Sequence, residues 1–185
     1  MRSLDITKVS KCRLCIELGK KHVPSFGDIN SPLMIIGQSP GAEEVKCSEP
    51  FVGPSGELME NMLAEIPMGK EECYIANAIK CRPPKNRPAK VSELNTCYQQ
   101  WLKREIKIVD PKVMLIVGKD AYMSILPPKV RKKLKFKHLN HYKFKSRVVV
   151  ITYHPGYFLR ANDTASFSEV GRILRPFVEE AMTEL

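Results

Sequence analysis

The sequence predicts an α/β fold, namely a three-layer α/β/α domain around a central, largely parallel four-stranded sheet. Two observations lead to this fold class. Short apolar runs alternate with segments of helical periodicity along the 185 residues, and the apolar runs end at glycines or polar residues. Alternation of strands and helices is typical of a parallel sheet that helices cover on both faces. The length suits a single domain, which we expect to span residues 1–185.

Four short apolar runs are the candidate strands, at 33–36, 73–76, 113–117 and 147–152. Polar, turn-rich sequences follow three of them: Gly-Gln-Ser-Pro-Gly after the first, Asn77 after the second, and His-Pro-Gly close behind the fourth. Ligands of such sheets gather at the carboxyl ends of the strands. We therefore expect these three sequences to converge in one crevice.

Apolar residues at helical spacing predict the elements between and after the strands. The helices are expected at 56–63, 92–110, 121–126 and about 168–182. Ser55 is expected to cap the first of them, because a serine side chain accepts hydrogen bonds from the free N–H groups of a first helical turn.

Positive charge is concentrated in one segment. The chain carries a formal charge of +10, and the segment 129–147 holds nine Lys and Arg residues and no acid. Lys-Phe-Lys occurs at 135–137 and again at 143–145, and this alternation predicts two strands of a hairpin with a cationic face. We expect Lys135 and Lys137 to contact a nucleic-acid backbone, since counterion release rewards such clusters. A merely solvated hairpin is the alternative.

Composition sets limits on the class of protein. Hydrophobic residues make up 43% and charged residues 27%, and no apolar run approaches the length of a membrane span. The first residues, MRSLDITKVSKC, lack the apolar core of a signal peptide. We therefore expect a cytoplasmic, nucleoid-associated protein without a membrane partner. In that compartment six cysteines favour thiols and metal ligation over disulfides.

Four of the cysteines form two clusters, Cys12-x2-Cys15 and Cys81-x15-Cys97. A Cys-x2-Cys pair can bind one metal centre from a single turn, and soft thiolates suit zinc or an iron–sulfur cluster. Scattered core cysteines are the alternative, because free cysteine is often buried. Cys47 and Cys73 fall outside both clusters and are expected to be structural.

Five motifs taken together carry a family resemblance. They are CRLC at 12–15, GQSPG at 37–41, PFVGPSGELM at 50–59, NAIKCRPPKNRP at 77–88 with Cys97 after it, and HPGYFLR at 154–160. In this order and spacing the chain resembles the family-4 uracil-DNA glycosylases, the iron–sulfur branch of their superfamily. The resemblance implies the glycosylase fold, and a [4Fe–4S] cluster in place of zinc on Cys12, Cys15, Cys81 and Cys97.

The resemblance also implies a partner and a set of roles. The partner is uracil-containing DNA, single- or double-stranded, bound by a monomer, and a replication or repair protein is the further partner to look for. Phe51 resembles the wall on which a flipped uracil stacks, and Asn77 the side chain that reads its N3–H and O4. His154 resembles the donor to O2 that stabilises the anionic leaving group.

Three further residues are matched to DNA contacts. Phe158 lines up with the wedge that fills the vacated base stack, and Arg160 with a phosphate contact. Ser55, after the Gly53-Pro54 turn, is expected to donate to the DNA backbone.

The first loop departs from the family pattern. Family-4 enzymes typically have GE(A/G)PG and family-1 relatives GQDPY, whereas this chain has Gln38 and Ser39 and so lacks both carboxylates. Gln38, Ser39 and Gly41 are expected to line the base site, with Gln38 orienting the attacking water through its carbonyl group.

This departure leaves three interpretations. The first is a monofunctional glycosylase that hydrolyses the N-glycosidic bond of uracil, or of a 5-substituted uracil, and leaves an abasic site without strand cleavage. The second is a catalytically silent DNA-binding accessory protein of replication or repair. The third is a zinc-stabilised nucleic-acid binder without glycosylase ancestry.

Overall fold

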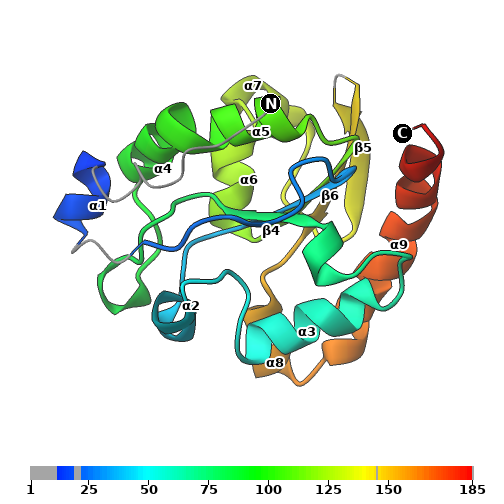
Figure 1. Ribbon diagram of the computed structural model, residues 1–185, viewed down its shortest axis with the longest axis horizontal. Coiled ribbons are helices and arrows are strands. Elements are labelled where there is room, and N and C mark those ends of the chain that lie inside the picture. The colour runs from blue at the N-terminus through cyan, green and yellow to red at the C-terminus, as the bar shows by residue number, and fades with distance from the viewer. Residues whose placement is uncertain (1–11, 19–21, 145, 185) are drawn as a thin grey trace.

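The computed structural model describes residues 12–18, 22–144 and 146–184, and within them it is a three-layer α/β/α structure (Figure 1). A six-stranded sheet with the order β1-β3-β2-β4-β6-β5 forms the middle layer. Its strands are β1 (Phe26–Gly27), β2 (Leu33–Gly37), β3 (Tyr74–Asn77), β4 (Val113–Val117), β5 (Asn140–Phe144) and β6 (Arg147–Thr152).

The four predicted strands are all present as the parallel centre of the sheet, β3-β2-β4-β6. The predicted fold class is therefore confirmed, while the strand count of four was too low. The two additional strands lie at the edges and run antiparallel, β1 beside β3 and β5 beside β6. A strand of two residues, such as β1, leaves no alternating pattern in a sequence, which is why it was missed.

The strand pairing predicted for the basic segment was wrong. A hairpin exists, but it joins β5 to β6, with Lys143 opposite Val148. Residues 135–137 lie outside every strand and follow the helix α7 (Pro128–Lys133). Phe136 instead packs its ring 5.3 Å from that of Tyr122. The alternation at 135–137 therefore comes from one packed aromatic ring between two exposed lysines. Lys145 lies outside the described residues.

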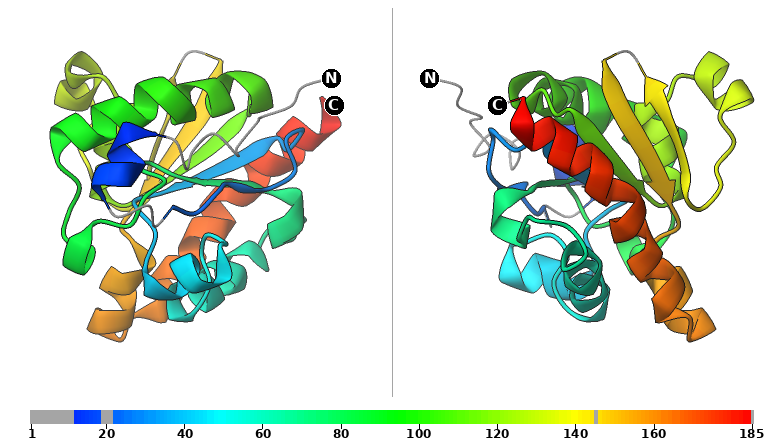
Figure 2. Two further views of the ribbon diagram at one scale, coloured as in Figure 1. Left: turned by 60° about the vertical axis from the view of Figure 1, so that its left-hand side comes forward. Right: turned by 90° about the vertical axis from the view of Figure 1, so that its right-hand side faces the viewer.

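Helices cover both faces of the sheet (Figure 2). One face carries α1 (Arg13–Glu17), α4 (Val91–Cys97), η4 (Tyr98–Leu102), α5 (Lys103–Val109) and α6 (Lys119–Ile125). The other carries α3 (Pro54–Leu63), α8 (Pro155–Ala161) and α9 (Thr164–Thr183). Alternate residues of β2 enter the two cores, because Met34 and Ile36 pack with the first set of helices and Leu33 and Ile35 with the second. Buried hydrophobic side chains form both cores, and this two-sided burial fixes the register of the sheet.

The predicted helices are present with shifted bounds. The long helix expected at 92–110 is α4, η4 and α5 in one run, and η4 is a π-helical turn. Ser55 does not cap α3, because the helix already begins at Pro54 and Gly53 is its N-cap. The last helix begins earlier than expected, since Asp163 caps it by accepting a hydrogen bond from the N–H of Ser166 at 3.3 Å. The short helices α1, α2 (Ala42–Cys47), α7 and α8 were not predicted.

In the described part of the chain, none of the helices combines the length and the apolar character that crossing a membrane requires.

Candidate active site

The carboxyl ends of the parallel strands meet at one edge of the sheet. The strand register places Gly37 opposite Asn77 and Val117 opposite Thr152. A cavity of about 450 Å³ lies at this edge. Eight of the predicted site residues line it: Gln38, Ser39, Gly41, Phe51, Ser55, Asn77, His154 and Arg160. The three turn sequences thus converge as the sequence predicted.

Gly37 lets two of these side chains approach each other. A Cβ atom at Gly37 would lie 2.4 Å from Oδ1 of Asn77 and 2.8 Å from Cζ of Phe51. Both side chains are almost fully buried, with exposed fractions of 4% for Asn77 and 3% for Phe51. An amide and an aromatic ring therefore share the floor of the cavity, and any larger residue at position 37 would displace one of them.

Phe51 is held in place by the carboxylate of Glu44. Its backbone is left-handed, with φ of 52°. Oε1 of Glu44 accepts a hydrogen bond from the N–H of Phe51 at 2.5 Å, and Oε2 accepts one from the N–H of Gly41. Burial raises the pKa of Glu44, and these hydrogen bonds act in the opposite direction. Glu44 therefore joins the two loops that carry the cavity. The signal was available, because Glu44 stands three residues after Gly41 in a capping-box position.

His154 is fixed in one tautomer. Its Nδ1 accepts a hydrogen bond from the N–H of Gly156 at 3.1 Å, so Nδ1 carries a lone pair and the proton sits on Nε2. Burial, together with the nearby positive charge of Arg160, lowers the pKa of His154 to about 4. The imidazole is thus neutral at pH 7 and keeps an Nε2–H donor. Its ring faces that of Phe51, with centroids 6.4 Å apart and planes inclined by 23°.

Gln38 is anchored through its carbonyl oxygen. Oε1 of Gln38 accepts a hydrogen bond from the N–H of Asp120 at 3.1 Å. The side chain lies against Gly118, where a Cβ atom would be 2.6 Å from Cδ of Gln38. This hydrogen bond occupies the carbonyl oxygen that was expected to orient water. The other polar group of the Gln38 side chain is its amide NH2.

The remaining predicted DNA contacts lie outside this cavity. Phe158 is only 2% exposed, and its ring packs 5.3 Å from that of Phe167 and 5.0 Å from that of His138. A wedge role for Phe158 does not fit this placement, because the ring points into the core. Lys135 and Lys137 are exposed but do not line the cavity. Asn86, which sequence reasoning missed, does line it.

Three of the four clustered cysteines lie in one apolar core. Cys12, Cys81 and Cys97 are buried together with Leu94 and Trp101. Sγ of Cys12 donates to Oε1 of Gln100 at 2.8 Å, which brings the N-terminal segment against the helical run that carries Cys97. The Cys15 side chain lies outside the described part of the structure.

The donor chemistry of this cysteine core fits a metal centre. In the described residues no three His, Cys, Asp or Glu side chains form a metal-holding group. Burial raises the pKa of the Cys97 thiol to about 12, and a bound cation is what stabilises such a thiolate. The indole N–H of Trp101, one turn beyond Cys97, is buried without a partner in the described structure. Soft sulfur donors and, in the same core, an N–H donor without a partner among the described residues suit a group with acceptor atoms of its own.

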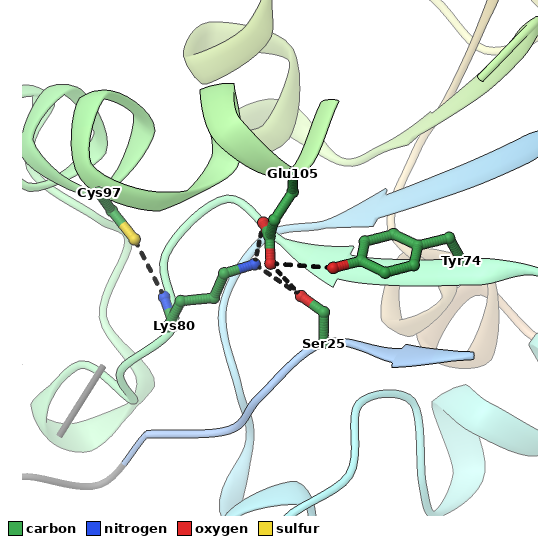
Figure 3. A network of polar contacts seen from close by, with 5 residues as sticks. All are labelled: Ser25, Tyr74, Lys80, Cys97 and Glu105. Atoms are coloured by element: carbon green, nitrogen blue, oxygen red, sulfur yellow. Dashed lines mark hydrogen bonds and ion pairs between the residues drawn. The ribbon is translucent and has the colours of Figure 1, made fainter. Parts of the chain in front are cut away.

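A buried ion pair adjoins the cysteines (Figure 3). Nζ of Lys80 lies 2.6 Å from Oε2 of Glu105, and both side chains are 2% exposed. Ser25 completes the network, since its hydroxyl group accepts from Lys80 at 2.9 Å and donates to Glu105 at 2.5 Å. Tyr74 donates to the same carboxylate at 3.3 Å. The backbone N–H of Lys80 donates to Sγ of Cys97 at 3.3 Å. Lys80 therefore joins the cysteine core to the polar network.

Comparison with known proteins agrees with this architecture. The family model described as "Uracil DNA glycosylase superfamily" matches residues 24–177. The type-4 uracil-DNA glycosylase of Archaeoglobus fulgidus is 32% identical in an alignment that covers 94% of each chain. That of Thermotoga maritima is 31% identical over 94% of this chain and 89% of its own. The type-5 uracil-DNA glycosylase of Thermus thermophilus is 26% identical over 99% and 96% of the two chains. The match over most of the chain shows that this protein belongs to the uracil DNA glycosylase superfamily.

Proposed function

We propose that this protein hydrolyses the N-glycosidic bond of uracil, or of a 5-substituted uracil, in DNA and leaves an abasic site. The observation that carries the proposal is the neutral Nε2–H donor of His154 in the same cavity as Phe51 and Asn77. The type-4 relatives are named for the same activity. They do not favour the interpretation of a silent DNA-binding protein. A binder without glycosylase ancestry is wrong, because the chain belongs to the superfamily.

Each side chain has a distinct task in this reaction. The flipped uracil stacks on Phe51, and Asn77 accepts from its N3–H and donates to its O4. His154 donates from Nε2 to O2, where negative charge develops as the bond to the sugar breaks. A preorganised donor at such a position lowers the barrier because it needs no reorganisation during the reaction. Water then attacks the sugar, and no lysine in the matched motifs is placed for a covalent path.

The groups around the cavity suit contacts with the DNA backbone. Arg160 lines the cavity from the exposed side of α8 and would hold a phosphate. Ser55 lies in the first turn of α3, where its hydroxyl group can donate to a phosphate oxygen. Lys135 and Lys137 add positive charge outside the cavity. These contacts would carry most of the affinity and its dependence on salt.

The cysteine core is proposed to hold a [4Fe–4S] cluster on Cys12, Cys15, Cys81 and Cys97, with zinc as the alternative metal. Such a cluster would supply a structural tie rather than electrons, because hydrolysis of a glycosidic bond transfers none. It would fix the N-terminal segment against the helical run and shape the loop from Arg82 to Pro88. Absorbance near 400 nm, together with iron analysis, separates the two metals, since zinc thiolate sites are colourless there.

The test of the proposed function is excision from an oligonucleotide that contains one uracil, with anaerobically prepared protein. We expect one cut at uracil after alkali treatment and none before it, which identifies a monofunctional glycosylase. Tight binding of the same DNA without any cut would overturn the proposal in favour of a silent DNA-binding protein.

Gln38→Glu is expected to increase the rate of excision. One carboxylate oxygen can keep the hydrogen bond from the N–H of Asp120, and the other then replaces the amide NH2 with an acceptor for water and a negative charge near the sugar. We expect a rise toward the roughly 100-fold that a positioned base contributes. Single-turnover rates on uracil DNA measure it.

Gln38→Ala serves as the comparison, because it removes the anchored amide and adds no charge. It should be slower than the wild type. Unchanged or lower activity of Gln38→Glu would show that the missing charge does not limit the chemistry.

Asn77→Asp is expected to weaken the discrimination between uracil and cytosine. An ionised aspartate cannot donate to O4 of uracil, whereas it can accept from the amino group of cytosine. The loss of one buried hydrogen bond corresponds to roughly a 10- to 100-fold change in the ratio of kcat/KM for the two bases. Asn86→Asp is the matched control, since Asn86 lines the same cavity but is exposed. If Asn77→Asp discriminates as well as the wild type, Asn77 does not read the base.

A further inference from the structure

A second cavity adjoins the first. Its volume is about 290 Å³, and it is lined by Gly118, Lys119, Phe136, Tyr153, His154 and Tyr157. His154 lines both cavities, so the two meet at this residue. A strand of DNA with one nucleotide in the first cavity would therefore have a neighbouring nucleotide within reach of the second.

Aromatic side chains line the second cavity, and neighbouring aromatic rings pack against them. The ring of Tyr153 lies 5.3 Å from that of Phe136 and 5.1 Å from that of Tyr157. Phe136 rests on Tyr122, and Tyr157 rests on Phe158, each at 5.3 Å. Tyr157 is nevertheless 50% exposed. A large aromatic ring that is both fixed and exposed offers a planar ligand a stacking surface at a small entropic cost.

The charge around the cavity favours an anionic ligand. None of the residues that line it is acidic, and one of them, the exposed Lys119, carries a positive charge. Lys135 and Lys137 flank Phe136 in the chain and are exposed. An apolar, aromatic floor with cationic edges matches a nucleotide, whose base is planar and whose phosphates are negative.

We propose that this cavity is a second nucleobase site, which stacks the unpaired base next to the nucleotide in the first cavity. The proposal rests on the proposed function, because it takes the occupant of the first cavity to be a nucleotide of DNA. Stacking on an aromatic side chain accepts any base. A base inside a duplex is already stacked and paired, so the site favours single-stranded or locally opened DNA.

Binding without excision tests this site. The probe is a fluorescent single-stranded oligonucleotide with a tetrahydrofuran abasic analogue at the target position, and anisotropy gives its Kd. Two further probes lack one more base each: the first lacks the base directly before the target position, and the second lacks the base directly after it. Tyr157→Ala should weaken binding of the first probe by about 5- to 100-fold. It should have little effect on the probe that lacks the stacked base, and Tyr157→Phe should bind like the wild type.

Leu159→Ala is the matched control, because Leu159 is 38% exposed on the same helix and lines neither cavity. Equal weakening on all three probes, or none, would overturn the proposal. A duplex with the same abasic analogue is the fourth probe, and weakening by Tyr157→Ala that is confined to this duplex would also overturn the proposal, because it would make Tyr157 a wedge for the vacated stack. A protein that shows the expected binding pattern but removes no uracil would refute the proposed function and leave the stacking site standing.

Discussion

His154→Asn is expected to lower kcat by about 10²- to 10³-fold while KM and stability change little. The asparagine Oδ1 can take the place of Nδ1 and keep the hydrogen bond from the N–H of Gly156, which caps α8. The Nε2–H donor is lost, because asparagine is too short to reach the same point. The substitution therefore removes the stabilisation of the leaving group and preserves the local fold. Single-turnover excision rates and thermal unfolding measure the two effects.

His154→Leu provides the comparison, since it removes the helix cap as well as the donor. It should lose activity to the same extent and also unfold at a lower temperature. A His154→Asn variant with wild-type kcat would remove His154 from the chemistry.

The lowered pKa of His154 gives this variant a second signature. In the unfolded chain the imidazole binds a proton below its ordinary pKa of 6.5, whereas the folded protein resists protonation down to about 4. The unfolded state therefore binds more protons in this window, and the free energy of unfolding falls as the pH drops from 6.5 to 4. His154→Asn should reduce this pH dependence. His138, whose pKa burial also lowers, is present in both proteins and cancels in the comparison.

Lys80→Met is expected to lower the free energy of unfolding by about 3–5 kcal/mol, because it leaves the Glu105 carboxylate buried without its counter-charge. Ser25 and Tyr74 would still donate to this carboxylate but cannot neutralise it. Denaturant unfolding of the metal-loaded protein measures the loss. The iron content of the same samples reports whether the cysteine core beside Lys80 is disturbed.

Two further variants make this prediction specific. Lys80→Met combined with Glu105→Gln removes both charges, and it should recover much of the lost stability. Arg175→Met breaks the exposed Arg175–Glu179 pair and should cost less than about 1 kcal/mol. If the single variant at Lys80 is as stable as the wild type, the buried pair contributes nothing to the fold.

The sequence predicted those parts of the fold that depend on apolar periodicity. The four central strands are continuous apolar runs, which a sheet covered on both faces requires. β1 was missed because it has only two residues, whereas the strand predicted at 143–145 overlaps β5 but was paired with the irregular segment before it. Local sequence alone cannot tell a strand from a loop in which one aromatic ring happens to be packed. That choice depends on Tyr122 and Tyr153, which lie elsewhere in the chain.

The sequence predicted the site residues whose positions the strand ends determine. It did not predict the side-chain orientations that tertiary contacts determine. Asn77 and His154 follow directly from the ends of β3 and β6. The orientation of Gln38 depends on Asp120, which is 82 residues away, and no local pattern encodes that contact. The burial of Phe158 depends on the rotation of α8 about its axis, which directs Phe158 to the core and leaves Tyr157 exposed.

Gly37 limits how this pocket can change in evolution. Every amino-acid substitution at a glycine adds at least a Cβ atom, and here that atom would meet Asn77 and Phe51 at less than 3 Å. Position 37 therefore has no conservative alternative, and a saturation library selected for activity should return glycine alone. Gln38, the next residue, differs from glutamate by one nucleotide in its codon. Two adjacent positions of one loop therefore differ in what they can accept. Position 37 accepts only glycine, whereas position 38 can gain a carboxylate through one nucleotide change.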